Sequence, residues 1–238
     1  MYGYDYGYGY SEYSGLLLIA VLLVFALGLV AQARVSGTFQ KYAKIQATAG
    51  IPAYEMASRL LQRSGSSVQV TQVGGRLTDH YNPKTNTVGL SQSVYDQSSV
   101  AALAVAAHEI GHVMQYEEGY LPIKLRNAVL PMASIGSGAA PWITLLGVFM
   151  GSFNLAMVGV WLFLGILLFQ FVTLPVEFNA SHRALVMLED GGYLAYDEVR
   201  DARKVLRAAA MTYVVAALST LVSFLRLLLM AQSTRRRN

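Results

Sequence analysis

The chain has 238 residues, of which 54% are hydrophobic and only 13% charged, so it carries far less charge than a soluble domain and is expected to contact lipid. It has no cysteine, which excludes disulfides, thiolate metal sites and cysteine nucleophiles and leaves His, Asp and Glu as possible metal ligands. The net charge of +4 is spread thinly and forms no basic face of the kind that nucleic acid needs, so no nucleic-acid partner is expected.

The N-terminal segment 1–15 alternates tyrosine with small or acidic residues, which predicts a disordered tail or one that lies in the headgroup region. Residues 16–33 are apolar without interruption, and at 1.5 Å per residue they cover roughly 27 Å, enough to cross the hydrocarbon core. A cleaved signal peptide is the competing interpretation. Because Asp5 and Glu12 precede the stretch and Arg34 follows it, a membrane anchor with its N-terminus outside is favoured.

The polar region that follows has the patterns of both helices and strands. The expected elements are a helix over 52–62, two extended segments over 68–73 and 87–90, and a long helix from about 97 to 117. The residues 81–86 between the extended segments are turn-forming. The segment 88–91 could offer a free strand edge to a peptide backbone, or could be a purely structural strand.

Three more apolar stretches follow in the second half of the chain. Residues 129–150 and 155–174 are separated by a short uncharged connection, which predicts a transmembrane hairpin. Residues 205–230 form a last span that contains Arg207 and Arg226, so this helix could also lie partly in the membrane interface.

The positive charges favour a cytoplasmic location for both polar regions, the one after the first span and the one after the hairpin. Four spans would then leave the basic residues 235–237 outside, contrary to the positive-inside rule. The sequence leaves the placement of this tail open.

The strongest motif is His108-Glu109-Ile110-Gly111-His112, which matches H-E-x-x-H within the predicted long helix. Side chains four residues apart lie on one face of a helix, so both imidazoles can reach one metal ion. Glu109 lies one position further round, where it can take a proton from an attacking water that zinc activates. The pattern therefore indicates a zinc peptidase, and the alternative is a helix with two incidental histidines.

A catalytic zinc needs a third protein ligand, for which Glu177, His182, Glu189 and Asp190 are candidates. Glu177 is favoured because it directly follows the hairpin, and a two-span excursion returns the chain to the side of the membrane that it left. An ordinary interfacial carboxylate is the alternative for Glu177. His182 is an alternative ligand or a donor to the transition state.

Peptide hydrolysis also needs a hydrogen-bond donor for the oxyanion. His182 and His80 rank first and are predicted, with Glu109, as catalytic residues. Each could equally be a surface or packing residue. The further candidates are Arg183, Tyr193 and Tyr213.

The motif helix and the residues around Glu177 resemble gluzincin-type metallopeptidases. More closely, the N-terminal span and the segments 77–81, 106–112 and 175–181 resemble the YugP-like family of neutral, membrane-bound zinc metallopeptidases. The resemblance implies Glu177 as the third ligand and peptide hydrolysis as the reaction. In related peptidases an Asp often replaces Ser181 and orients a ligand histidine; a serine can accept that hydrogen bond but carries no charge.

We therefore expect a mainly α membrane protein with about four transmembrane helices and a gluzincin-like zinc-peptidase core that contains a short β-strand element. The expected function is a membrane-embedded, zinc-dependent endopeptidase that hydrolyses peptide or protein substrates at or near the surface of the cell membrane, with its active site on the cytoplasmic face. An intramembrane protease is disfavoured, because the polar residues that flank the motif helix are unsuited to lipid. A non-catalytic zinc-binding scaffold is disfavoured because Glu109 is present.

The expected divisions are a tail at 1–15, a first transmembrane helix at 16–33, a catalytic region at 34–127, a transmembrane hairpin at 128–175, a third-ligand segment at 176–204, a last transmembrane or interfacial helix at 205–231 and a basic tail at 232–238.

Overall fold

The computed structural model describes the backbone of residues 7–237 and the side chains of residues 15–235. The first six residues of the predicted tail lie outside the described residues. From Gly7 onward the tail belongs to the first helix.

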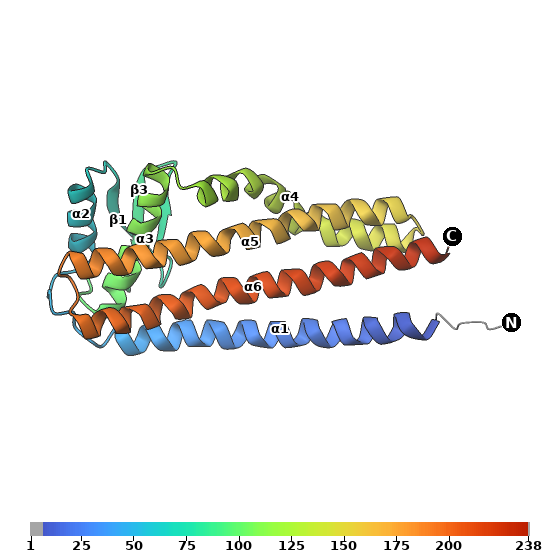
Figure 1. The fold of residues 1–238 in the computed structure, drawn as a ribbon, viewed down its shortest axis with the longest axis horizontal. Coiled ribbons are helices and arrows are strands. Elements are labelled where there is room, and N and C mark those ends of the chain that lie inside the picture. Colours follow the sequence, from blue (N-terminus) through green and yellow to red (C-terminus); the bar gives the residue numbers. More distant parts are fainter. Residues whose placement is uncertain (1–6, 238) are drawn as a thin grey trace. The chain divides into compact units, whose positions relative to one another are not determined.

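In chain order the elements are α1 (Gly7–Tyr42), α2 (Ala53–Ser64), β1 (Gln69–Val73), β2 (His80–Asn82), β3 (Thr87–Ser91), α3 (Val100–Glu117), α4 (Leu121–Phe149), α5 (Phe153–Asp190) and α6 (Tyr196–Arg237) (Figure 1). The described residues divide into two compact units, a helical unit (7–30, 125–173 and 213–237) and an α/β unit (31–124 and 174–212).

Among the residues that the structure describes, four helices, α1, α4, α5 and α6, are long and apolar enough to cross a membrane. In the helical unit many large apolar side chains point outward, among them Phe149, which is 91% exposed, and Trp142. Such a surface is unfavourable in water and suits lipid. The chain is a mainly α-helical membrane protein, as the composition predicts.

Glycines allow α4 and α5 to pack closely within the helical unit. A Cβ atom at Gly159 would lie 2.6 Å from the carbonyl oxygen of Ala140, and one at Gly136 would lie 2.7 Å from the carbonyl oxygen of Leu162. Neither position could hold a larger residue without separating the two helices. This is the small-residue packing expected between membrane helices.

The helices are longer than the apolar stretches that predicted them. Helix α4 begins at Leu121, with Pro122 in its first turn, where a missing N–H costs little. Helix α5 continues through Pro175 to Asp190, and α6 begins at Tyr196. Hydropathy marks only the part of a helix that contacts lipid, whereas the backbone hydrogen bonds continue into polar surroundings.

The sheet of the α/β unit has the strand order β1–β3–β2, with β1 parallel and β2 antiparallel to β3. Strand β3 is central, and its Val88 and Leu90 are fully buried. The prediction that 88–91 offers a free edge is therefore wrong, because β1 and β2 already occupy both sides of that strand. The second edge of the sheet is β2, which overlaps the start of the segment 81–86 that was predicted as a turn.

Helix α3 forms the centre of the α/β unit, and most of its residues are buried. Its N-terminus is capped by Ser99, whose side chain accepts a hydrogen bond of 3.2 Å from the backbone N–H of Ala102. The run of alanines that follows makes α3 slender, so neighbouring elements can approach its backbone closely.

We predict that Ser99→Ala lowers the free energy of unfolding of the α/β unit by about 1 kcal/mol, because a backbone N–H of α3 loses its capping partner. Thermal unfolding in detergent would measure the loss. Ser98→Ala is the matched control, since the Ser98 hydroxyl bonds the exposed Gln46 side chain and its loss should be nearly neutral. Equal losses for the two variants would contradict the capping role.

Candidate metal centre

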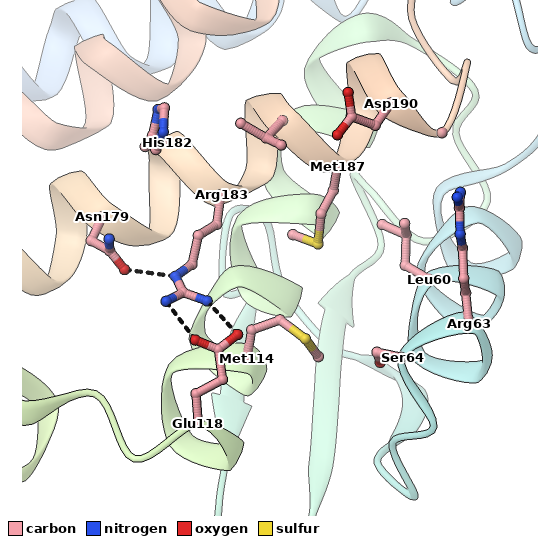
Figure 2. Close-up of a pocket in the computed structure, with 12 residues that line it drawn as sticks. Leu60, Arg63, Ser64, Met114, Glu118, Asn179, His182, Arg183, Met187 and Asp190 are labelled. Carbon is pink, nitrogen blue, oxygen red and sulfur yellow. Dashed lines mark hydrogen bonds and ion pairs between the residues drawn. The ribbon is translucent and has the colours of Figure 1, made fainter.

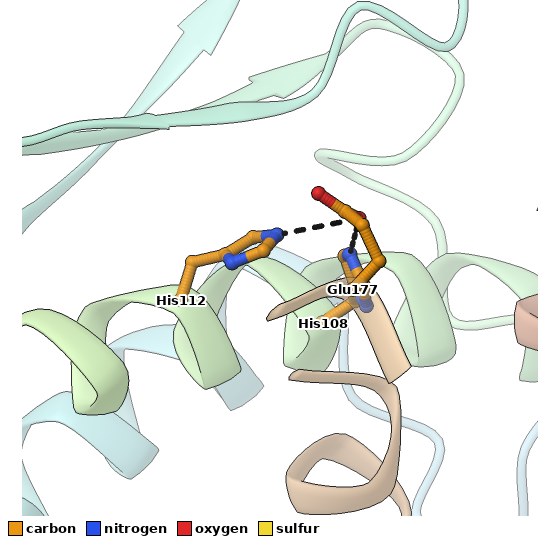
Figure 3. Close-up of side chains that lie close together, drawn as sticks. All are labelled: His108, His112 and Glu177. Atoms are coloured by element: carbon orange, nitrogen blue, oxygen red, sulfur yellow. Dashed lines mark ion pairs between the residues drawn. The ribbon is translucent and has the colours of Figure 1, made fainter. Parts of the chain in front are cut away.

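Two histidines of α3 and a glutamate of α5 point toward one another (Figure 3). The Nε2 atoms of His108 and His112 lie 3.4 Å and 3.7 Å from Oε2 of Glu177. Glu177 is 3% exposed, and both imidazoles are partly buried. The structure thus brings together the three residues that the sequence predicted as metal ligands.

The geometry of this cluster fits a zinc ion. Ligand atoms at about 2.0–2.1 Å from a tetrahedral zinc are separated from one another by roughly 3.3 Å. This is close to the 3.4 Å and 3.7 Å between the two Nε2 atoms and Oε2 of Glu177. Two imidazoles and one carboxylate are also a ligand set of catalytic zinc sites, in which the fourth position takes water or substrate.

The second nitrogen of each imidazole has a hydrogen-bond partner outside the cluster. Nδ1 of His108 lies 3.2 Å from the Ser181 hydroxyl, and Nδ1 of His112 lies 3.0 Å from Oε1 of Gln115. Ser181 thus stands where the resemblance placed a residue that orients a ligand histidine. Gln115 was not predicted, although its spacing of three residues after His112 puts the two side chains on one helix face.

Glu177 reaches the histidines because α3 and α5 touch backbone to backbone. A Cβ atom at Gly111 would lie 2.6 Å from the carbonyl oxygen and 3.1 Å from the Cα atom of Ala180. Ala180 follows Glu177 by three residues, less than one helical turn. Gly111 therefore has a structural role in the motif, since any side chain there would displace the helix that carries Glu177.

Glu109 lies next to His108 on α3 and is 8% exposed. Burial raises the pKa of Glu109 above its ordinary value, while the neighbouring imidazoles of His108 and His112 oppose the rise. A carboxylate with a raised pKa is a stronger proton acceptor. Its position and basicity suit a general base.

Asp79 is a second acidic group near Glu109, and the two carboxylates repel each other. Its side chain accepts hydrogen bonds from the backbone N–H of Ser91 at 2.7 Å and from the Ser91 hydroxyl at 3.0 Å, which ties the start of β2 to the end of β3. Burial raises the pKa of Asp79. The sequence motif 77–81 contains this residue, but motif reasoning gave it no role.

The two histidines predicted as oxyanion donors lie outside the metal cluster. The imidazole of His80 packs over Gly89, and its Nδ1 lies 2.9 Å from the carbonyl oxygen of Thr78. Its neighbour Tyr81 contacts Tyr116 of α3, and since side chains alternate along a strand, His80 points to the opposite face of the sheet.

His182 is exposed and follows Glu177 by five residues, a rotation of roughly 140° around α5. Its side chain therefore points to a different side of the helix from Glu177. The donor roles of His80 and His182 stay predictions. Of the other candidate ligands, Glu189 and Asp190 are exposed at the end of α5 and do not join the cluster.

A pocket of about 560 Å³ lies between α2, α3 and α5 (Figure 2). In the pocket, Arg183 forms an ion pair of 2.7 Å with Glu118, the residue that follows α3. The pocket is lined by Leu60, Arg63, Ser64, Met114, Glu118, Asn179, His182, Arg183, Val186, Met187, Asp190 and Gly191.

Comparisons with known proteins give a consistent result. A family model described as "Putative neutral zinc metallopeptidase" matches residues 17–232. A protein of Bacillus subtilis (strain 168) named "Putative membrane protease YugP" is 42% identical over 225 residues, which cover 93% of this chain and 100% of that protein. No solved structure matches. The family match includes the whole cluster, and zinc is the metal that both the family and the grouped side chains indicate.

We predict that Gly111→Ala weakens zinc binding roughly tenfold or more, the scale expected when ligand orientation is disturbed. Replacing glycine by alanine inside a helix normally stabilises it by about 0.5–1 kcal/mol, but here the new Cβ atom would push α5 away. Gly37→Ala in α1 is the control, because a Cβ atom there meets no atom within 4 Å. The zinc affinity of both variants would be measured by competition with a chelator, and their stability by thermal unfolding. Unchanged zinc affinity in Gly111→Ala would show that the backbone contact does not position Glu177.

Proposed function

The chain belongs to the neutral zinc metallopeptidase family, and on this basis we propose that it is a zinc-dependent endopeptidase that hydrolyses protein substrates at or near the membrane surface. The observation that carries the proposal is the convergence of His108, His112 and Glu177, with Glu109 next to the first histidine.

His108, His112 and Glu177 would hold the zinc ion. When bound, zinc supplies a Lewis acid that polarises the scissile carbonyl and makes water acidic enough to be deprotonated near neutral pH. Glu109 accepts the proton of the attacking water and delivers it to the leaving amine. Ser181 and Gln115 hold the imidazoles in place by their Nδ1 atoms.

We further propose that the substrate backbone lies along β2. This strand is at an edge of the sheet, and Tyr81 at its centre contacts Tyr116 of the motif helix with ring centroids 5.4 Å apart. An extended peptide can add to a sheet edge through main-chain hydrogen bonds. In this proposal the strand edge that binds the substrate is β2 and not the segment 88–91.

The reaction site is proposed to lie outside the hydrocarbon core. Helix α3 is absent from the candidate membrane spans found among the described residues, and the polar residues 96–99 precede it directly. Charged and polar groups so close to the motif would be costly in lipid. These features favour cleavage at the membrane surface over intramembrane proteolysis.

We predict that Glu109→Gln retains zinc and loses peptide hydrolysis by a factor of roughly 10²–10⁴, the usual contribution of a general base. Zinc content and the cleavage rate of an unstructured protein substrate would be measured in detergent. Glu177→Ala is the comparison, and it should lose zinc and activity together. Full activity in Glu109→Gln would remove Glu109 as the base, and a wild-type protein that binds no zinc would remove the proposed function.

A cytoplasmic active site is proposed from the charge distribution, and the absence of cysteine makes it testable with single-cysteine variants. Met150→Cys, in the exposed connection after α4, should react with a membrane-impermeant maleimide on intact cells. Thr85→Cys, in the exposed turn after β2, should react only after the cells are permeabilised. The reverse pattern would place the active site outside.

A further inference from the structure

We propose that Gln115 is a positioning residue that sets the tautomer of His112, so that Nδ1 carries the hydrogen and Nε2 presents its lone pair to the metal. This inference rests on the proposed function, since it takes His112 as a zinc ligand. Its basis is a chain of hydrogen bonds that runs from His112 through α5 to an ion pair at the pocket of Figure 2.

The orientation of the Gln115 amide follows from its partners. Its Nε2 atom donates to the carbonyl oxygen of Val176 at 2.8 Å and to Oδ1 of Asn179 at 2.9 Å. Both partners are acceptors, so the amide nitrogen must face α5 and the amide oxygen must face His112. Gln115 is fully buried, so water has little access to replace these bonds.

The orientation of Asn179 is set in the same way, one step further along the chain. Its Oδ1 atom also accepts a hydrogen bond of 2.8 Å from Nε of Arg183. An arginine side chain can only donate hydrogen bonds, so the Asn179 oxygen must face Arg183 and with it Gln115. Arg183 itself is held by two contacts of 2.7 Å to the Glu118 carboxylate (Figure 2). Its guanidinium lies over the Tyr120 ring.

Arg183, which can only donate hydrogen bonds, therefore determines the direction of every hydrogen bond between its guanidinium and the His112 imidazole. Oε1 of Gln115 can only accept, so Nδ1 of His112, 3.0 Å away, must donate. A neutral imidazole with hydrogen on Nδ1 has its lone pair on Nε2, the atom that faces Glu177.

The two histidines proposed as ligands differ in whether the hydrogen-bond partner of Nδ1 selects a tautomer. The partner of His108 is the Ser181 hydroxyl, which can donate or accept and so does not select a tautomer. The assignment of a positioning role is therefore specific to Gln115.

The first test is zinc affinity, measured by chelator competition on the full-length protein in detergent. Gln115→Met keeps the length of the side chain and removes its hydrogen bonds, and zinc affinity should fall roughly 10–100-fold. Val113→Ala is the matched control on the same helix, because it removes buried apolar contacts and no bond to a histidine. It should lower the melting temperature and leave the zinc affinity of the folded protein unchanged.

Gln115→Glu separates positioning from packing. Like the methionine variant, it loses both donated bonds to α5, but it keeps an oxygen that accepts from His112. Under the proposal it binds zinc at least tenfold more tightly than Gln115→Met. Equal zinc affinities for the two folded variants, or wild-type affinity in Gln115→Met, would overturn the proposal.

The second test reads the tautomer directly and does not depend on either variant folding. The chain has four histidines, so a wild-type protein labelled with ¹⁵N-histidine gives few ring signals, and the variants His80→Gln, His182→Gln and His108→Gln assign three of them, which leaves the fourth to His112. In the metal-free protein, at a pH high enough for the His112 ring to be neutral, the single ring hydrogen should be on Nδ1. A hydrogen on Nε2 would overturn the proposal.

The outcomes distinguish this inference from the proposed function. A wild-type protein that binds zinc, shows the Nδ1 tautomer and cleaves no peptide would refute the peptidase and leave the role of Gln115 standing. A wild-type protein that cleaves peptides while the neutral His112 ring carries its hydrogen on Nε2 would refute the role of Gln115 and leave the proposed peptidase function standing.

Discussion

The backbone contact between Gly111 of α3 and Ala180 of α5 is the constraint on which the metal centre depends. Two imidazoles on one helix face provide two of the three protein ligands of a catalytic zinc site. A glutamate side chain can provide the third only from a helix that packs closely against them. Glycine is the residue that permits this approach. The same contact places Val176 and Asn179 within reach of Gln115, so one helix carries both Glu177 and the groups that orient Gln115.

Polar groups in this region form a series of hydrogen-bond partners with complementary roles, which runs from the exposed Glu118 to the buried Gln115. The series from Glu118 through Arg183, Asn179 and Gln115 to His112 alternates donors and acceptors consistently, and no described buried side-chain polar atom lacks a partner. Buried polar networks rigidify a site when all members are satisfied and destabilise it when one is not. The candidate metal centre of this chain is thus supported by interactions that reach well beyond its three grouped side chains.

The sequence predicted the features that depend on local pattern. The four spans, the capped motif helix and the convergence of Glu177 with the two histidines follow from hydropathy, helix periodicity and the return of the chain after two spans. The central place of β3 was missed because β2 has only three residues and lies among turn-forming ones. The orientations of His80, His182 and Gln115 depend on tertiary contacts, which a single sequence does not encode in any local pattern.

Glu177, the residue proposed as the third ligand, comes late in the chain, and this has a consequence for biosynthesis. A ribosome that has completed α3 has delivered His108 and His112, but Glu177 emerges only after both hydrophobic arms of the hairpin have been made. Two histidines alone hold zinc weakly. A nascent chain that ends before α5 therefore has only two of the three grouped side chains, and the proposed zinc site can form only after both arms of the hairpin have been synthesised.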